Sequence, residues 1–230
     1  MKLKFYSLCL IFFFFAFSVF AQPVSFRNQL KNEIQSWGSC RTVAITRTGG
    51  IAVYGSNWWF ATANVPRNLT DEIRKLTRDG EFINDVVLTE QGRWVILYGN
   101  NGLIWDGISS NDSLLAKLRE HNESNQTILS VAFNDIGGWA VITPNNFSAS
   151  DSELLNWLVE GSRQFGQLWT VFLSDDAMIA IYENGYRSKG PVPQSLLDNL
   201  NRSNIEFYMV KFSGAAWFFA DIDGNYMHNF

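Results

Sequence analysis

A short apolar run recurs five times along the chain. Each copy holds a valine among β-branched, aromatic and small residues, and the five valines are 43, 45, 40 and 39 residues apart. Self-similarity at a period of about 20 to 50 residues is the signature of a repeat architecture. The pattern therefore predicts five copies of one structural unit. The runs are Thr42–Thr46, Asp85–Thr89, Ser130–Asn134, Thr170–Ser174 and Met209–Ser213.

Two further short runs follow the first run in every copy. The second runs are Ile51–Tyr54, Trp94–Tyr98, Trp139–Thr143, Ile179–Tyr182 and Trp217–Ala220. The third runs are Trp58–Ala63, Leu103–Gly107, Phe147–Ala149, Tyr186–Ser188 and Tyr226–His228. Residues rich in Gly, Asn and Asp separate the runs, and these residue types accept the left-handed backbone of a hairpin turn. Each unit is therefore predicted to begin with three strands joined by hairpins.

A helical pattern follows four of the five third runs. Leu and Ile residues recur there at spacings of three and four, which line one face of a helix. These residues are Leu69, Ile73 and Leu76; Leu114, Leu115 and Leu118; Leu154, Leu155 and Leu158; and Leu196, Leu197 and Leu200. The fifth copy stops at Phe230 without such a segment. The same spacing instead precedes the first copy, in Phe26, Leu30, Ile34 and Trp37.

The unmatched ends predict how the units are arranged. An open array of repeats needs polar end units, but the last unit contains the aromatic residues Trp217–Phe219 and the segment Tyr226–Phe230. We therefore predict an α+β repeat fold, a closed ring of five strand-strand-strand-helix units in which the N-terminal helix completes the last unit. An open stack is the alternative.

A ring of five units of about 42 residues resembles a five-bladed propeller. The closer resemblance is to the α/β-propeller, or pentein, architecture, whose ββαβ unit is a circular permutation of the unit found in this chain. The resemblance covers residues 23–230. Penteins that modify guanidino groups use a cysteine nucleophile near the end of the chain, with histidine and acidic partners. In this sequence Cys40 lies near the beginning without such a motif, so that activity is not implied.

The first 21 residues predict export. Lys2 and Lys4 precede an apolar run from Leu8 to Phe20, and Val19-Phe20-Ala21 suits signal peptidase, as in a secretory signal peptide. The run is shorter than the roughly 20 residues of a membrane-spanning helix, although an uncleaved anchor is the alternative. We expect cleavage after residue 21, a single domain over residues 22–230 without a membrane span, and a secreted or periplasmic location.

Composition narrows the choice of partners. Loss of Lys2 and Lys4 leaves 16 basic against 22 acidic residues, a net charge of −6 that disfavours nucleic acid. Cys40 is the only cysteine of the predicted mature chain, so an intrachain disulfide is excluded. The two histidines, His121 and His228, have no partner at ligand spacing. We expect neither a metal nor another cofactor.

Two sets of residues are candidates for function. Aromatic residues beside the second turn and on the third run alternate between the two faces of a sheet, and an exposed one would suit a sugar or a peptide. These are Trp58, Trp59, Trp105, Tyr186 and Tyr226. Aspartates that could face the ring centre or its rim are Asp85, Asp106, Asp135, Asp175 and Asp221. Core packing is the competing interpretation of the aromatic residues, and turn formation that of the aspartates.

The sequence therefore predicts an exported, non-catalytic repeat module that binds a protein or carbohydrate partner. The alternative is a small glycosidase-like hydrolase with carboxylates at the ring centre. Such a hydrolase needs two carboxylates roughly 5 to 10 Å apart, whereas a binding module does not.

Overall fold

The computed structural model describes residues 25–54, 58–203 and 206–230. The predicted signal peptide, residues 1–21, lies outside the described residues. The described chain forms five antiparallel three-stranded sheets, in each of which the strands follow chain order. Four sheets are followed by a helix, and one further helix precedes the first sheet. The predicted repeat of three strands and a helix is confirmed.

Helices and sheets alternate from one unit to the next. The first and second units contain α1 (Phe26–Trp37), β1 (Thr42–Ile45), β2 (Gly50–Tyr54), β3 (Trp58–Ala61), α2 (Arg67–Arg78), β4 (Ile83–Leu88), β5 (Trp94–Tyr98), β6 (Gly102–Asp106) and α3 (Ser113–Glu123). The third and fourth contain β7 (Ser130–Phe133), β8 (Trp139–Ile142), β9 (Phe147–Ala149), α4 (Ser152–Phe165), β10 (Leu168–Leu173), β11 (Met178–Tyr182), β12 (Gly185–Lys189) and α5 (Gln194–Arg202). The fifth contains β13 (Met209–Ser213), β14 (Ala216–Ala220) and β15 (Tyr226–His228).

The predicted third strands differ from the observed ones by one or two residues. The strand predicted to run to Ala63 ends at Ala61, and the strand predicted over Tyr186–Ser188 extends to Gly185–Lys189. The end of β3 is set by Thr62, whose hydroxyl accepts a hydrogen bond from the Gly50 N–H at 3.0 Å. The predictions for β9 and β15 match residue for residue.

Each helix packs between two consecutive sheets, and this packing divides the core into five hydrophobic clusters. In one of them, Leu69 and Ile73 of α2 pack with Ile51 of the first sheet and with Val86 and Ile96 of the second. α3, α4 and α5 do the same between the second and third, third and fourth, and fourth and fifth sheets. Middle strands such as β8 and β14 are buried along their whole length, because they have clusters on both faces.

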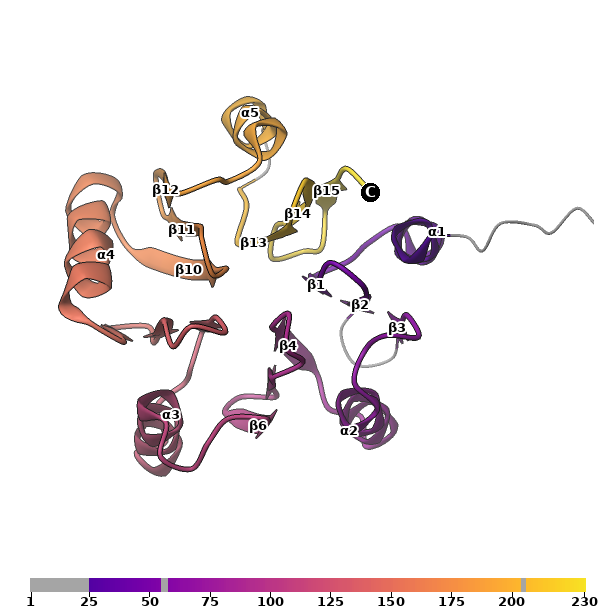
Figure 1. The fold of residues 1–230 in the computed structure, drawn as a ribbon, viewed down its shortest axis with the longest axis horizontal. Coiled ribbons are helices and arrows are strands. Elements are labelled where there is room, and N and C mark those ends of the chain that lie inside the picture. Colours follow the sequence, from indigo (N-terminus) through magenta and orange to yellow (C-terminus); the bar gives the residue numbers. More distant parts are fainter. Residues whose placement is uncertain (1–24, 55–57, 204–205) are drawn as a thin grey trace, which may run out of the picture.

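The cluster of α1 is made from the two ends of the chain. Leu30 and Ile34 of α1 pack with Phe218 of the fifth sheet, with Phe230 just after it, and with Ala52 of the first sheet. Figure 1 shows the helices at the periphery, β1, β4, β10 and β13 nearest the centre, and the C-terminus beside α1. In the described part of the chain, no helix has the length and apolar character that a membrane crossing requires.

Candidate functional site

A cavity of about 470 Å³ lies where the first strands of all five sheets end. A volume of this size is typical of small-molecule sites, which span about 300 to 1,000 Å³. Its lining is drawn from every unit because each first strand runs into a tight turn at the same end. The lining residues are Ile45, Arg47, Val87, Leu88, Thr89, Glu90, Phe133, Asn134, Asp135, Phe172, Leu173, Ser174, Asp175, Asp176, Pro191, Phe212, Ser213 and Gly214.

Three phenylalanines, one from each of three first strands, give the cavity an aromatic wall. They are Phe133 of β7, Phe172 of β10 and Phe212 of β13. The rings of Phe172 and Phe212 lie 4.6 Å apart between centroids, a distance at which aromatic pairs attract. Phe133 and Phe212 are buried and Phe172 is half-buried. A ligand in this cavity would therefore meet an apolar surface on one side.

The turns that follow the first strands are polar. In each unit, the position two residues after the last apolar residue of the first strand lies in such a turn, and it is charged in four of the five units. The five residues are Arg47, Glu90, Asp135, Asp175 and Gly214. Asp176 follows Asp175 and also lines the cavity. The rim of the cavity is therefore mainly acidic.

Backbone N–H groups of one turn donate to the carboxylate of the next turn. The Arg47 N–H lies 3.1 and 3.0 Å from the two Glu90 carboxylate oxygens. The Gln91 N–H donates to Asp135 Oδ2 at 3.0 Å, and the Asp135 N–H donates to Asp175 Oδ1 at 2.9 Å. This succession links the first four turns. It stops at the fifth, because Gly214 has no side chain to accept the next bond.

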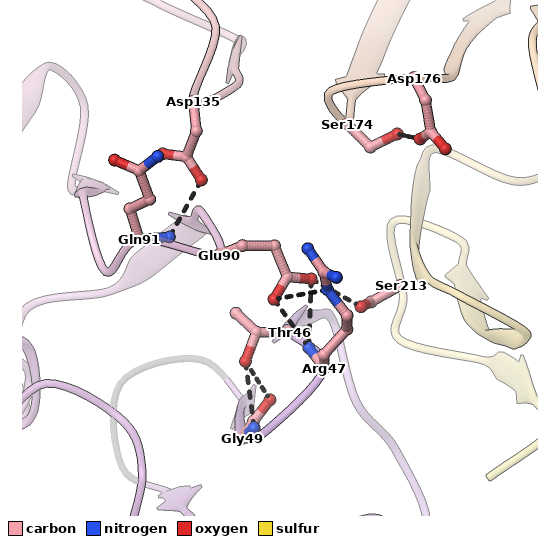
Figure 2. Close-up of polar contacts among 9 residues, drawn as sticks. All are labelled: Thr46, Arg47, Gly49, Glu90, Gln91, Asp135, Ser174, Asp176 and Ser213. Carbon is pink, nitrogen blue, oxygen red and sulfur yellow. Dashed lines mark hydrogen bonds and ion pairs between the residues drawn. The ribbon is translucent and has the colours of Figure 1, made fainter.

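Further contacts occupy two of these carboxylates (Figure 2). Glu90 also accepts a hydrogen bond from Ser213 Oγ of the fifth unit at 2.9 Å, and Arg47 Nε lies 3.6 Å from Glu90 Oε2. Arg93 Nε lies 3.0 Å from Asp135 Oδ1, and the Asp135 side chain is only 2% exposed. Both oxygens of Glu90 and of Asp135 are therefore engaged by the protein.

Asp175 and Asp176 are engaged on one oxygen each. Asp175 Oδ1 accepts the Asp135 N–H, and Asp176 Oδ1 accepts a hydrogen bond from Ser174 Oγ at 2.9 Å. Both residues are exposed. Within the described ranges, neither forms an ion pair with Lys, Arg or His. Asp175 and Asp176 therefore each keep one carboxylate oxygen without a described hydrogen bond.

Asp85, the candidate aspartate on β4, is buried in an ion pair. Its carboxylate lies 3.0 Å from Lys211 Nζ of β13 and accepts a hydrogen bond from Thr42 Oγ1 of β1 at 2.8 Å. The side chains of Asp85 and Lys211 are 2% and 4% exposed. Asp85 therefore joins the first, second and fifth units and is not open to a substrate.

The other two candidate aspartates lie outside the cavity lining. Asp106 is exposed at the end of β6 and accepts a hydrogen bond from the Asn68 side chain. Asp221 accepts hydrogen bonds from the N–H groups of Asp223 at 2.9 Å and Asn225 at 2.8 Å, so it forms a turn. Among residues 25–54, 58–203 and 206–230, no group of three or more His, Cys, Asp or Glu is placed to hold a metal ion.

The candidate aromatic residues lie on the third strands of four sheets, outside the lining of the cavity. Trp58 is the most exposed, at 50%, and its ring centroid lies 6.5 Å from that of Trp37 and 6.0 Å from that of Tyr54. Trp59 packs against the α2 cluster, with Arg74 over its ring at 5.7 Å.

The remaining three candidate aromatic residues are also half-buried against helices. Trp105 packs against the α3 cluster beneath Arg119, 5.8 Å from its ring centroid. The Tyr186 hydroxyl donates to Asn201 Oδ1 at 3.0 Å, and the Tyr226 hydroxyl donates to the Ile34 carbonyl at 3.3 Å. Trp58 and Trp59 are consecutive on β3, with Trp58 beside Trp37 of α1 and Trp59 against α2, so the structure does not bring the five candidates together on one surface.

Sequence reasoning missed Arg47, Glu90 and the phenylalanines of the cavity. The signal was present, because Glu90 and Arg47 stand at the same place in their units as Asp135 and Asp175. Alignment of the five copies residue by residue through the first turn would have shown a column of charges. The sequence does predict Asp135 and Asp175 as candidates, and both line the cavity.

No family model matches the chain, and no curated protein matches it. Two solved structures that match the chain weakly are crystal structures of the extracellular domain of BT4673 from B. thetaiotaomicron, assigned in one to a one-component and in the other to a hybrid two-component system. The first is 11% identical with a TM-score of 0.34, covering 83% of this chain and 34% of that one. The second is 11% identical with a TM-score of 0.31, covering 79% and 32%. The chain thus spans about a third of the length of these structures.

Proposed function

We propose that the chain is an exported, non-catalytic binding module, a closed ring of five units whose ligand site is the 470 Å³ cavity. Closure is supported by the position of α1 between the fifth and the first sheets, which matches the position of every other helix between its own two sheets. It is supported independently by Lys211, which pairs with Asp85 beside Thr42 and so connects the last unit to the first two.

Export and processing belong to the same proposal. Residues 1–21 have the composition of a cleaved signal peptide, and the mature chain would start at Gln22 as one domain. Intact-mass analysis of exported protein tests this, because a mass that retains residues 1–21 would make the segment an anchor.

The observation that carries the binding function is the convergence of all five units on one cavity with an aromatic wall and an acidic rim. Small-molecule sites combine apolar walls with a few polar groups that fix the orientation of the ligand. Asp175 and Asp176 are such groups, since each has its described hydrogen bond on one carboxylate oxygen and the other oxygen to offer. A carbohydrate surface at Trp58, which is exposed beside Trp37 and Tyr54, is the second candidate.

The hydrolase alternative finds less support in the contacts. A glycosidase needs one carboxyl to donate a proton and a second carboxylate to act as nucleophile or base. Asp85 and Asp135 are held in ion pairs with Lys211 and Arg93 and are each 2% exposed. Glu90 is held by Arg47 and Ser213. Asp85, Glu90 and Asp135 are therefore committed to protein partners.

A cavity-blocking variant tests the site. Pro191 is an exposed lining residue, so Pro191→Trp should fill the cavity mouth with little loss of stability. Ile222→Trp is the matched control, because Ile222 is 59% exposed on a turn of the fifth unit and does not line the cavity. The mature protein is screened by calorimetry against sugars, amino acids, amines, alcohols and carboxylic acids.

We expect a compound that binds the native protein to lose its affinity for Pro191→Trp and to keep it for Ile222→Trp. Binding that survives in both variants would place the site elsewhere. In that case Trp58→Ala tests the second candidate, because it should abolish carbohydrate binding at a cost below about 1 kcal/mol of stability. Hydrolysis of a glycoside by the native protein, lost in Asp175→Asn, would instead establish the alternative.

A further inference from the structure

The chemistry of the cavity indicates which class of ligand it takes, and this inference rests on the proposed function. The carboxylates of the cavity rim differ in how many of their oxygens already accept hydrogen bonds from the protein. Glu90 and Asp135 are satisfied by protein donors on both oxygens. Within the part of the chain that the structure describes, Asp175 and Asp176 each accept a single hydrogen bond, on one oxygen only. The negative charge of the rim is therefore uncompensated at the fourth unit.

The cations near this part of the rim already have partners. Arg93 lies 3.0 Å from Asp135, and Arg47 lies 3.6 Å from Glu90 with its side chain 75% exposed. Lys189 lines an adjoining cavity of about 360 Å³ together with Asp175 and Asp176, but its ammonium lies 2.7 Å from Glu153. A cation that entered the cavity would thus meet two carboxylates that form no ion pair with any described side chain.

Gly214 leaves one position of the cavity lining without a side chain. In the other four units the same position carries a charged side chain, whereas a Cβ at Gly214 would meet no described atom within 4 Å. Gly214 has φ +56°, which glycine adopts without strain. The succession of carboxylates therefore ends at an unfilled position in the same cavity that holds the unused oxygens of Asp175 and Asp176.

The aromatic wall favours a particular kind of cation. Phe172 belongs to the same strand as the turn of Asp175, and its ring packs on Phe212 at 4.6 Å between centroids. Aromatic faces attract organic cations and accept apolar groups. A neutral apolar ligand would remove water from the carboxylates without replacing its hydrogen bonds, and an anion would be repelled.

We propose that the cavity binds a primary organic ammonium ion with an apolar or aromatic body. The ammonium group donates to Asp175 and Asp176, and the body lies against Phe172 and Phe212. Hydrogen bonds between ionised groups are about twice as strong as neutral ones, so the charge supplies the selectivity and the wall supplies the fit.

Three probes with the same phenylethyl body and a different charge test the proposal. Calorimetry on the mature chain compares 2-phenylethylamine, which is a cation at pH 7, with 2-phenylethanol and 3-phenylpropionate. We expect the amine to bind at least about tenfold more tightly than the alcohol, and the carboxylate most weakly. The affinity of the amine should fall as NaCl rises, because salt screens the rim charge.

Variants that remove the carboxylate charges identify the groups that bind the ammonium ion. Asp175→Asn/Asp176→Asn should reduce the affinity of the amine at least about tenfold and leave that of the alcohol within about twofold. Asp71→Asn is the control, since Asp71 is an exposed acid on α2 that pairs with Arg74 of the same helix. A thermal melt of each variant shows that it is folded.

The outcomes separate this proposal from the proposed function. Equal binding of amine and alcohol, or an amine affinity unchanged in the double variant or equally reduced in the Asp71→Asn control, overturns the ligand class. If a probe or a sugar then still binds and loses affinity in Pro191→Trp, the cavity remains the ligand site. Absence of binding by every compound of the screen, or binding that Pro191→Trp does not alter, refutes both.

Discussion

Replacing Lys211 by Met should destabilise the protein strongly. Lysine usually faces solvent, where its loss costs little stability, but Lys211 is buried within β13. The Lys211 ammonium lies 3.0 Å from the Asp85 carboxylate, and both side chains are nearly inaccessible, at 4% and 2%. Methionine keeps the length of the side chain and removes the charge, so Asp85 would be left buried without its counter-ion. Removal of one partner of such a pair costs about 3–5 kcal/mol. Because Thr42 Oγ1 still donates to Asp85 at 2.8 Å, we expect about 3 kcal/mol.

Urea unfolding followed by tryptophan fluorescence measures this cost as a lower midpoint at an unchanged slope. Lys189→Met is the matched control, because it removes a lysine from an exposed pair with Glu153 whose side chains are 52% and 81% accessible. Exposed pairs contribute about 0–1 kcal/mol. The double variant Lys211→Met/Asp85→Asn keeps an acceptor for Thr42 and removes both charges, so it should recover most of the loss.

A loss below about 1 kcal/mol for Lys211→Met, equal to that of the control, would refute the reasoning. So would a double variant that is less stable than Lys211→Met alone, since the cost would then not come from an isolated buried charge. Either result would also weaken the argument that the fifth unit is joined to the first two through this pair.

Three further predictions use other parts of the fold. Deleting residues 23–37 removes Leu30 and Ile34, which are completely buried, so the truncated protein should lose about 3–6 kcal/mol or oligomerise; a monomer by gel filtration with an unchanged melting temperature would contradict this. Burial raises the pKa of the Cys40 thiol to about 12, so Ellman's reagent at pH 8 should label the native protein slowly and the guanidinium-unfolded protein at once. Rapid labelling of the native protein would show that Cys40 is accessible. Burial also lowers the pKa of His228, so the unfolded chain takes up the proton at a higher pH than the folded chain, and the stability of the fold should fall as the pH drops below about 6.5. Between pH 7 and pH 5, the melting temperature of His228→Gln should decline less steeply than that of the native protein. An identical slope would assign the decline to other groups.

The repeated unit could be predicted from the sequence because its signals are local. A short run of β-branched and aromatic residues between turn residues indicates a strand, and apolar residues at spacings of three and four indicate a helix. The turns between strands are marked by residues that accept unusual backbone angles. Five copies of the same signals reinforce one another, so even β9, with only three residues, is predictable.

The role of single side chains could not be predicted in the same way, because it depends on partners far along the chain. Lys211 and Asp85 are 126 residues apart, and no local pattern indicates their contact. That the five candidate aromatic residues lie on separate parts of the surface could not be predicted for a related reason. A strand shows that Trp59 and Trp105 point to one face or the other, but only the packing of α2 and α3 decides that those faces are covered.

The position of α1 has a consequence for how the chain reaches its folded state. α1 is the first described element to be synthesised, and its buried residues Leu30 and Ile34 pack with Phe218 and Phe230, almost two hundred residues later. Contacts between residues so distant in sequence are slow to form, because a long loop must close before they are gained. The apolar face of α1 is therefore covered completely only after Phe230 has been made. Until then a growing chain carries part of that face uncovered, because only the residues of the first sheet, such as Ala52, are available to pack on it.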